Sequence, residues 1–408
     1  MSSCQAPLQI GDVVLSRYVI RDVLGCGGMG IAYLAEDRGG RKVVIKQPNP
    51  GGNAPIDLIV EKLEKEAEFL RDIWNKYGGH PNIVKFIDFG HIGATPVLVE
   101  EYVEGESLAD YVVKTGGLDP DVGYNVAVQL ADALAFLHRI GRLHRDLAPD
   151  NIIIQPHNNY RIVLIDFGTA KRGKGQGTRI AKLGFSPPEI IIRGEFYESS
   201  DVYMWGATVL SILKPLNAQL ATLAPQQRIA RYIATNGRLV DKPCNLVVCG
   251  KYERKLSWVL SKALDPDYRN RFWDGLELSN ALVQERRAYL FYKDQKWVLD
   301  PGKKATVTIG RRADISLDDP YGYLEERHVE IQYDEGNDVW LIRDLGSVNG
   351  TAIKRRGNFI VVSPGCRHMC PGPPSRPVEL LDGDEIVLAF SEALRLPYIF
   401  LKFKLGNV

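Results

Sequence analysis

Three glycines at a fixed spacing could bring backbone N–H groups close to phosphate oxygens. Gly25, Gly27 and Gly30 form a GxGxxG pattern in a stretch (18–37) that alternates, turns on the glycines and alternates again. Because glycine has no Cβ, the backbone of such a turn can lie over the oxygens of a triphosphate. The next strand-like run, KVVIK, ends in Lys46. An ordinary glycine-rich hairpin and a solvated lysine are the alternatives, but the order of the two features favours a nucleotide site.

A helix is expected over EKLEKEAEFLRDIW (61–74), because its apolar residues recur at helical spacing. Glu66 borders the apolar stripe and can face inward. An ion pair between Glu66 and Lys46 would hold the lysine on the α- and β-phosphates of a nucleotide. The alternative is that Glu66 is a solvated acid, like its neighbouring glutamates.

Further motifs follow in an order that is typical of one family. The stretch HRDLAPDN (144–151) places Asp146 five residues before Asn151, and DFG (166–168) comes after it. With the glycines and Lys46, these motifs resemble bacterial or archaeal eukaryotic-like serine/threonine protein kinases over about residues 18–283. The other motifs of the series are HPNIV (80–84), LVEEYVEGESL (98–108), SPPE (186–189), SSDVYMWG (199–206) and DPDYRNRF (265–272).

The resemblance implies an α+β, two-lobed protein kinase fold with ATP in the cleft between the lobes. From about residue 285 the sequence changes to short β-like runs separated by Gly, Asp and Asn, which favours an all-β sandwich. The expected domains are an N-terminal extension (1–17), a kinase domain (18–284, with a small lobe at 18–103 and a large lobe at 104–284) and the sandwich (285–408).

The resemblance also implies roles for the polar residues of these motifs. Phosphoryl transfer needs mainly positioning and charge neutralisation, so few groups carry it. Asp146 would orient the substrate hydroxyl and accept its proton. Asp166 and Asn151 would hold Mg²⁺ or Mn²⁺, which prefer hard oxygen ligands.

Other residues would surround the adenine ring or support the catalytic loop. The resemblance places the ring between apolar side chains and sets backbone groups at its edge. It also implies an ion pair inside the large lobe and an aspartate that braces the loop 144–151. The faces of the ring would be covered by Leu24, Ala32, Val44 and Ile153, its edge by Glu101 and Val103; the ion pair would be Glu189–Arg271, and the bracing residue Asp201.

Two positions depart from the family pattern in ways that bear on activity. The family usually has a lysine two residues after the catalytic aspartate, where this chain has Ala148. It usually has a threonine where KLGFSPPE (182–189) begins with Lys182. Since that threonine lies beside the catalytic residues in active kinases, Lys182 could supply the ammonium that position 148 lacks. The alternative is that Lys182 points to solvent.

Glu100 is a third unusual residue. It stands directly before the Glu-Tyr-Val hinge, where the family commonly has an uncharged side chain at the back of the ATP pocket. A buried carboxylate is costly unless it is paired. Either Glu100 pairs with a nearby basic group, or the register with the family shifts by one residue.

The segment between the DFG and SPPE motifs carries five basic residues among glycines. Such a segment is typical of a solvated loop, but it could also contact a phosphate or an acidic substrate. Thr178, followed by Thr169 and Ser186, is the leading candidate for phosphorylation. Arg145 could pair with the added phosphate.

The C-terminal part resembles a second family. Gly310-Arg311, His328 and Asn349-Gly350-Thr351 are similar to motifs of forkhead-associated (FHA) domains, over about residues 289–408. Such domains bind phosphothreonine peptides. Arg311 matches the arginine that binds the phosphate, Asn349 matches the residue that holds the peptide backbone, and His328 matches a structural histidine.

Glu325 departs from this second pattern, because the family has a serine three residues before the histidine. A carboxylate repels a phosphate, so an expected donor is replaced by a like charge. Arg312, Arg327 or the run Lys354-Arg355-Arg356 could compensate, although that run is also typical of a solvated loop. The alternative is a docking or self-association module that does not bind phosphate.

Composition narrows the class of protein. The formal net charge of +1 gives no general attraction to nucleic acid or to a membrane surface. The six cysteines are scattered along the chain, which favours reduced thiols. The sequence does not start with a charged segment followed by an apolar one, and it has no apolar run long enough for a membrane span, so we expect a cytoplasmic protein. VYMWGATVLSIL (202–213) is expected to be a buried core helix, and CRHMC (366–370) is not a typical zinc pattern.

The sequence therefore favours an ATP- and Mg²⁺-dependent serine/threonine protein kinase that autophosphorylates and recruits phosphorylated proteins through an FHA module. The competing hypothesis is an ATP-binding pseudokinase scaffold with an FHA module that does not bind phosphate, which Ala148 and Glu325 favour. A small-molecule phosphotransferase is a third option, and the SPPE segment and the expected Glu189–Arg271 pair disfavour it. Protein substrates are expected, and neither nucleic acid nor membrane is.

Overall fold

The chain forms two compact units, residues 1–282 and 283–408, in a computed structural model. Their relative placement is not determined. The structure describes residues 6–28, 30–52, 54–172, 175–176, 184–283, 287–301, 303–334, 339–355, 357–365, 372–390 and 398–406, with the backbone alone at 171–172 and 175–176.

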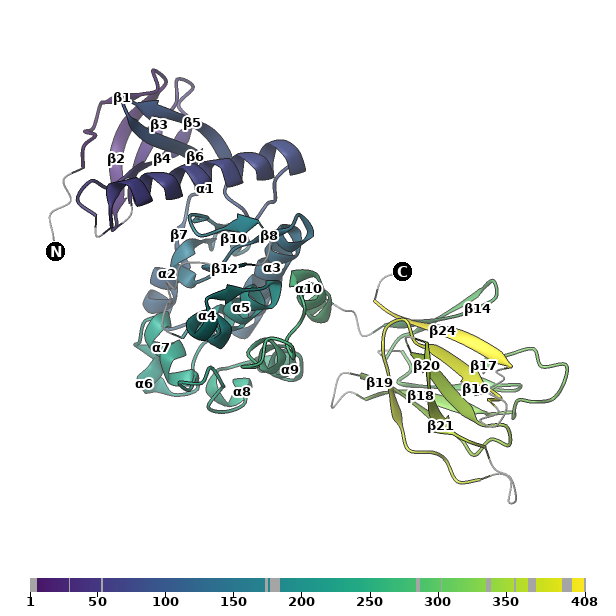
Figure 1. Cartoon of the computed structure of the whole chain (residues 1–408). Coiled ribbons are helices and arrows are strands. Elements are labelled where there is room, and N and C mark those ends of the chain that lie inside the picture. The colour runs from purple at the N-terminus through teal and green to yellow at the C-terminus, as the bar shows by residue number, and fades with distance from the viewer. Residues whose placement is uncertain are drawn as a thin grey trace. The chain divides into compact units, whose positions relative to one another are not determined.

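The first unit begins with an antiparallel sheet in the strand order β1-β2-β3-β4-β6-β5, drawn in purple to blue in Figure 1. Alternating apolar residues, among them Tyr18, Tyr33 and Ile45, are fully buried on one face of this sheet. β1 lies in the stretch expected to be an N-terminal extension, so part of that stretch belongs to the sheet. The strands are β1 (Val13–Val14), β2 (Tyr18–Cys26), β3 (Gly30–Glu36), β4 (Lys42–Pro48), β5 (Phe86–Ile92) and β6 (Thr95–Glu101).

Helix α1 (Ile56–Tyr77) packs against β4, β5 and β6. The predicted helix is therefore present, and it extends beyond the predicted range at both ends. Its buried face contains Leu63 and Leu70, and Glu66 lies on the same face with an exposed fraction of 6%. The helix ends at Gly78, whose φ of 78° is a left-handed conformation that glycine adopts without strain.

The large lobe is mainly helical. α5 (Glu198–Ile212) is packed by α3, α7 and α9, and all its residues except Glu198 are buried, which confirms the core helix predicted over 202–213. The other helices are α2 (Leu108–Thr115), α3 (Pro120–Arg139), α4 (Pro188–Arg193), α6 (Ala218–Ala221), α7 (Pro225–Tyr232), α8 (Pro243–Leu246), α9 (Glu253–Ala263) and α10 (Gly275–Val283). The short strands are β7 (Glu106–Ser107), β8 (Arg142–Leu143), β9 (Ile152–Gln155), β10 (Arg161–Leu164), β11 (Lys171–Arg172), β12 (Gly175–Gln176) and β13 (Glu195–Phe196).

The second unit is a β-sandwich, which confirms the predicted α+β class with an all-β C-terminal part. One sheet has the strand order β15-β14-β24-β23-β20-β21, and the other has the order β17-β16-β18-β19-β22. The main apolar core of the sandwich includes Ile309, Ile331 and Phe403. The strands are β14 (Ala288–Tyr292), β15 (Gln295–Leu299), β16 (Thr306–Gly310), β17 (Ile315–Ser316), β18 (Val329–Asp334), β19 (Val339–Asp344), β20 (Thr351–Arg355), β21 (Asn358–Ser363), β22 (Val378–Leu380), β23 (Glu385–Leu388) and β24 (Ile399–Leu405).

Cys244 and Cys249 form a disulfide, with Cα atoms 5.6 Å apart. The expectation of reduced thiols is therefore wrong for this pair, because the chain turns back after α8 and brings the two cysteines together. It is also wrong for Cys26, which is disulfide-bonded. None of the helices in the described ranges is long and apolar enough to cross a membrane.

Candidate active site

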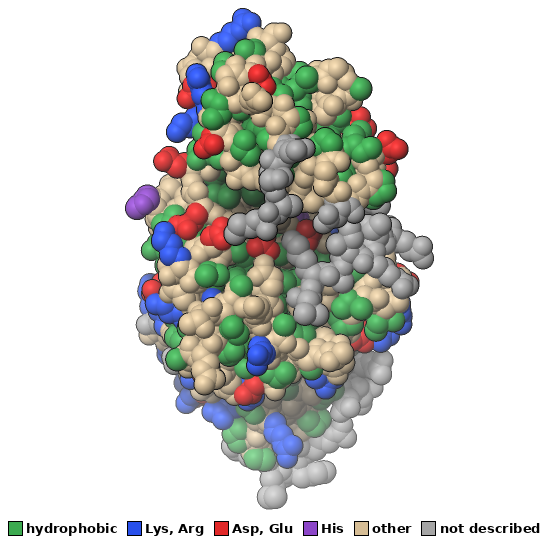
Figure 2. Space-filling model, turned by 90° about the vertical axis from the view of Figure 1, so that its left-hand side faces the viewer, with side chains coloured by type: hydrophobic (Ala, Val, Ile, Leu, Met, Phe, Trp, Pro, Cys, Tyr) green, Lys and Arg blue, Asp and Glu red, His purple; other side chains and the backbone are tan. Residues whose placement is uncertain are grey.

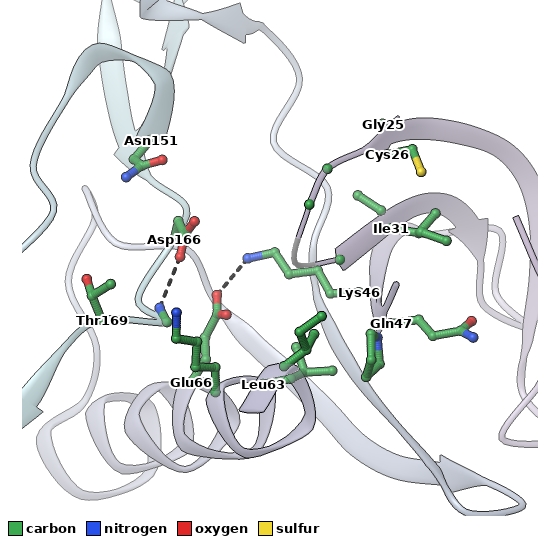
Figure 3. A pocket seen from close by; sticks show the side chains of 18 of the residues that line it. Gly25, Cys26, Ile31, Lys46, Gln47, Leu63, Glu66, Asn151, Asp166 and Thr169 are labelled. Carbon is green, nitrogen blue, oxygen red and sulfur yellow. Dashed lines mark hydrogen bonds and ion pairs between the residues drawn. The ribbon is translucent and has the colours of Figure 1, made fainter. Parts of the chain in front are cut away.

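Lys46, near the end of β4, lies at the centre of a buried ionic cluster, of which Figure 3 shows the pair with Glu66. Its Nζ atom is 2.7 Å from Glu66 Oε1 on α1 and 3.1 Å from Glu100 Oε2 on β6, and it donates to the carbonyl oxygen of Ile165 at 2.7 Å. Burial disfavours the ammonium, but the charges of Glu100, Glu66 and Asp166 outweigh burial and raise the pKa of Lys46 above its ordinary value. Lys46 is therefore held as a cation.

Glu100 finds its basic partner in Lys46, so the register with the kinase motifs needs no shift. Its exposed fraction is 2%. Burial raises the pKa of Glu100 to about 8, against the attraction of Lys46 and with a further increase from the negative charge of Glu66. Burial likewise raises the pKa of Glu66. Burial is the main cause of both shifts, and the neighbouring carboxylates of the cluster add to it.

A cavity of about 630 Å³ collects the polar residues that the sequence singled out. Its lining comes from both lobes: the glycine-rich turn and β4 from the small lobe, α1 beside them, and the loops after β8 and β10 from the large lobe. Figure 2 shows acidic side chains gathered on this face, at the level where the two lobes meet. Among the lining residues are Gly25, Gly27, Gly30, Lys46, Glu66, Asp146, Asn151, Asp166 and Thr169.

The oxygen atoms in this cavity suit a hard divalent cation. Asn151 Nδ2 donates to the backbone oxygen of Asp146 at 2.8 Å and to its Oδ2 at 3.0 Å, which orients the Asn151 Oδ1 atom away from that contact. The Asp166 carboxylate accepts the backbone N–H of Gly168 at 3.0 Å, as the dashed line in Figure 3 shows. A carboxylate and an amide oxygen are typical ligands of Mg²⁺.

A second cavity, of about 350 Å³, contains the residues expected at the adenine ring. It also contains Glu100, and it shares Lys46 with the larger cavity. Thus Glu100 lies where the two cavities meet. The expected residues found here are Leu24, Ala32, Val44, Glu101, Val103 and Ile153.

Asp201 on α5 fixes the backbone of the loop at residues 144–151. The Asp201 carboxylate accepts the backbone N–H groups of His144 and Arg145, each at 2.8 Å, and lies 3.0 Å from His138 Nε2. Burial alone would raise the pKa of Asp201, but the hydrogen bond and charge of His138, with the backbone donors, lower it below its ordinary value. Arg145 has a φ of 70°, so this bracing also holds a backbone conformation that arginine rarely adopts.

Ala148 stands where the kinase family usually has a lysine, and Lys182 is the residue expected to replace that lysine. Ala148 is fully buried in the main hydrophobic core of the first unit. The side chain of a lysine at position 148 could not take the place of the alanine methyl group in this core and would have to point toward the cavity. The alanine is therefore consistent with the packing around it. Lys182 and Thr178 lie outside the described residues.

The other two candidate phosphorylation sites differ in exposure, since Thr169 is half-buried and Ser186 is buried. Thr169 Oγ1 donates to the carbonyl oxygen of His144 at 3.2 Å and Thr169 lines the larger cavity, while Ser186 has an exposed fraction of 7%. The Arg145 guanidinium lies over the ring of Phe196, 4.5 Å from its centroid.

The ion pair between Glu189 and Arg271 is buried in the large lobe. Arg271 donates from Nη1 to Glu189 Oε1 at 2.7 Å and from Nη2 to Oε2 at 2.9 Å. This bidentate pair links the start of α4 to the segment after α9, so it positions the end of the SPPE motif.

In the second unit, the loops that carry Arg311 and Asn349 both bond to the segment 323–325, whereas His328 is internal. His328 is fully buried, with Nε2 3.1 Å from the Gly350 carbonyl oxygen and Nδ1 accepting the Glu325 N–H at 3.3 Å, so its contacts are internal. Asn349 Nδ2 donates to the Tyr323 carbonyl oxygen at 2.8 Å, and Arg311 is exposed.

Glu325 meets a backbone donor of the loop that carries Asn349, since its Oε1 atom lies 3.4 Å from the N–H of Val348. The basic residues expected to offset it are differently placed. Arg312 lies 3.3 Å from Glu326, and Arg327 is exposed. The expectation of a solvated loop at 354–356 is wrong for its first two residues, because Lys354 and Arg355 lie on β20 and pair with Glu385 and Asp384, at 3.0 and 2.7 Å; Arg356 lies outside the described residues.

Sequence reasoning missed one residue beside the glycine-rich turn. Asn49 Nδ2 donates to the Gly27 carbonyl oxygen at 2.8 Å, and Gly52 approaches Gly28 so closely that a Cβ would collide with its carbonyl oxygen. The only signal was the NPGG composition of this segment, which indicates a turn without saying what it contacts. CRHMC (366–370) lies outside the described residues, and no cluster of potential metal-ligating His, Cys, Asp and Glu occurs within those that the structure covers.

Comparison with known proteins agrees with this arrangement. The family model described as protein kinase domain matches residues 18–264, and the one described as FHA domain matches residues 307–389. The chain belongs to the protein kinase family, and its second unit contains an FHA domain. Protein kinases use ATP with Mg²⁺ or Mn²⁺, and they act on proteins.

Three curated relatives show the range of similarity. Serine/threonine-protein kinase F of Synechocystis sp. is 32% identical over 53% of this chain and 47% of its own length. Serine/threonine-protein kinase PknG of Mycolicibacterium smegmatis is 31% identical over 68% of this chain and 33% of its own length. PrkC of Bacillus subtilis is 31% identical over 50% and 31%. The chain thus spans less than half the length of these relatives.

Proposed function

We propose that this chain is an ATP- and Mg²⁺-dependent serine/threonine protein kinase (residues 18–284) that autophosphorylates and carries an FHA module (residues 285–408). The observation that carries the proposal is the single cavity lined by Lys46, Asp146, Asn151 and Asp166, which adjoins the cavity expected to hold adenine. The division of the chain after Leu282 supports the domain boundary.

Each polar side chain of the cavity would have its own role in phosphoryl transfer. Asp146, oriented by Asn151, would accept the proton of a serine or threonine hydroxyl. Lys46, paired with Glu66, would neutralise charge on the phosphates, and the backbone of the glycine-rich turn would cover them. Asp166 and the Asn151 amide oxygen would hold Mg²⁺ or Mn²⁺, which supplies charge neutralisation at the transferred phosphoryl group.

Intact-mass spectrometry of the full chain tests the proposal. Protein that starts unphosphorylated should gain one or more phosphate masses with Mg-ATP, and Asp146→Asn should gain none. An unchanged wild-type mass, with Mg-ATP and with an added protein substrate, would favour the ATP-binding scaffold. The comparisons do not support that alternative, and Lys46, Asp146, Asn151 and Asp166 line one cavity.

We further propose that Lys182 supplies the cation that Ala148 does not. Its support is the sequence, since a lysine is lost at one position and gained at another that the family places beside the catalytic aspartate. Lys182→Ala should then reduce phosphate incorporation nearly as strongly as Asp146→Asn. Retained turnover in Lys182→Ala would disprove this role. Phosphopeptide mapping would show whether Thr178 is the main acceptor, with Thr169 the weaker candidate.

The FHA module is proposed to recruit phosphothreonine-containing proteins through Arg311 and Asn349. The exposure of Arg311 and the position of Asn349 on the adjoining loop support phosphate recognition. Glu325 supports the alternative, a docking module for unphosphorylated proteins. Calorimetry with phosphothreonine peptides and their unphosphorylated forms separates the two functions.

A further inference from the structure

The ammonium of Lys46 already has three acceptors inside the protein. A lysine side chain has three N–H donors. In this structure they face Glu66 Oε1 at 2.7 Å, the Ile165 carbonyl oxygen at 2.7 Å and the Glu100 carboxylate, whose two oxygens lie 3.1 and 3.2 Å from Nζ. A phosphate oxygen could therefore receive a hydrogen bond from Lys46 only if one of these acceptors gives up its own.

Glu100 is the acceptor that Lys46 can most readily leave. Its contact is the longest of the three, whereas Glu66 is also 3.4 Å from the backbone N–H of Phe167. Glu100 is fixed on β6, directly beside β4, with Val44 as its register partner. Because the sheet holds Glu100 in place, the contact must lengthen when the ammonium moves toward a ligand in the larger cavity.

Charge makes this contact costly for a nucleotide. Around one ammonium the cluster gathers three carboxylates, those of Glu66 on α1, Glu100 on β6 and Asp166 after β10. A nucleotide brings further negative charge, and like charges at close range in a buried site repel strongly. Glu100 thus opposes nucleotide binding in two ways, by occupying a donor of Lys46 and, above its pKa of about 8, by adding a negative charge beside the phosphates.

We propose that Glu100 is a positioning residue that restrains the Lys46 ammonium, so that nucleotide binding must displace the Glu100–Lys46 contact. This inference rests on the proposed nucleotide site. It assigns to Glu100 a role opposite to that of Glu66, which pairs with the same lysine but supports nucleotide binding. The kinase would bind nucleotide less tightly than its pocket otherwise allows.

Calorimetric titration of the full chain with ADP and Mg²⁺ tests the inference, at a pH above the pKa of about 8 that burial gives Glu100, so that the wild-type side chain is charged. Glu100→Gln keeps the shape of the side chain and removes its charge, and we expect it to bind Mg-ADP about ten-fold more tightly than wild type. Glu100→Leu removes the contact as well and should bind at least as tightly. Glu36→Gln is the matched control, because it removes a small-lobe carboxylate that pairs with Arg21 at 2.8 Å and lines neither cavity. Equal or weaker binding by folded Glu100→Gln would overturn the inference.

A second measurement tests the Glu100–Lys46 contact in the absence of nucleotide. In competitive labelling with acetic anhydride at one pH above the Glu100 pKa of about 8, loss of the Glu100 charge in Glu100→Gln should lower the pKa of Lys46 and increase its labelling about ten-fold. The exposed Lys42 of the same strand should not change. A change at Lys46 no larger than at Lys42 would overturn the inference. If labelling responds as expected but no protein binds Mg-ADP, the proposed kinase function fails while the restraint on Lys46 stands.

Discussion

Both units contain a loop that is organised by a buried aspartate. In the first unit, Asp201 accepts the backbone N–H groups of His144 and Arg145. In the second unit, Asp344 accepts the N–H groups of Gly346 and Ser347 at 2.8 and 2.7 Å, together with the hydroxyls of Ser347 and Thr351. Backbone donors converge on a carboxylate in each case, which is a strong way to fix a loop.

The two aspartates differ in how far along the chain they reach. Asp201 lies 57 residues after His144, so its bonds place the catalytic loop relative to helix α5 and the cavity above it. Asp344 binds the residues that directly follow it, so its bonds shape a loop locally, on the face that carries Asn349. The first arrangement assembles side chains from distant segments, as phosphoryl transfer needs. The second presents one exposed surface, as binding of a peptide needs.

The largest expected effect is at Asp146, which the first loop positions. Asp146→Asn should lower phosphate incorporation by about 10²–10⁴-fold, because the proton of the acceptor hydroxyl loses its base. Intact mass after incubation with Mg-ATP measures it. Asp150→Asn is the matched control, since Asp150 belongs to the same loop but is exposed and bonds to Gln226 at 2.6 Å. An equal loss in Asp150→Asn would mean that the loop as a whole, and not Asp146, had been damaged.

The contrast between the two aspartates can be tested directly. Asp201→Ala and Asp344→Ala each leave buried donors without an acceptor, at a cost of about 2–4 kcal/mol in the free energy of unfolding. Urea titration measures this cost. Only Asp201→Ala should also abolish phosphate incorporation, because only its loop carries Asp146. If Asp344→Ala abolished incorporation equally, the second unit would be required for catalysis and the proposed division of labour would be wrong.

The sequence predicts the local features of both units well, namely the motifs and the helices and strands. The spacing of HRDLAPDN and DFG, with the glycine-rich turn, indicates the kinase family, and the helical spacing in 61–74 places Glu66 on the inner face of α1. The alternation of apolar residues predicts the C-terminal sandwich, because side chains on a strand point to opposite faces in turn.

Contacts between distant segments that the family resemblance does not imply were not predictable in the same way. The bonds from Glu100 to Lys46 and from Asn49 to Gly27 join different strands or turns, and only the register of β4 with β6 brings the first pair together. The Cys244–Cys249 disulfide depends on how the chain turns after α8. Composition suggested reduced thiols, since it describes the average protein and not this turn.

Glu325 tests whether the second loop face is a phosphate site with one unsuitable residue. Glu325→Ser removes a negative charge and restores a hydroxyl donor, so affinity for phosphothreonine peptides should rise about ten-fold or more. Calorimetry measures it, with the unphosphorylated peptide alongside. Glu326→Ser is the control, because Glu326 is exposed and pairs with Arg312. No gain in Glu325→Ser would favour a docking module that does not read phosphate.

The smallest expected effect concerns the hydrogen bond that Asn49 makes to the glycine-rich turn. Asn49 Nδ2 donates to the Gly27 carbonyl oxygen at an exposed position, whereas the bonds of Asp201 and Asp344 to backbone N–H groups are buried, and the turn also contains Cys26, which is disulfide-bonded. Asn49→Ala removes one solvent-accessible hydrogen bond, so KM for ATP should rise about three-fold with kcat unchanged. Asn245→Ala, which removes a similar bond to Asp241 at 2.9 Å in the large lobe, should leave KM unchanged. A fall in kcat as large as that expected of Asp201→Ala would mean that the number and burial of the bonds do not decide how much each loop contributes.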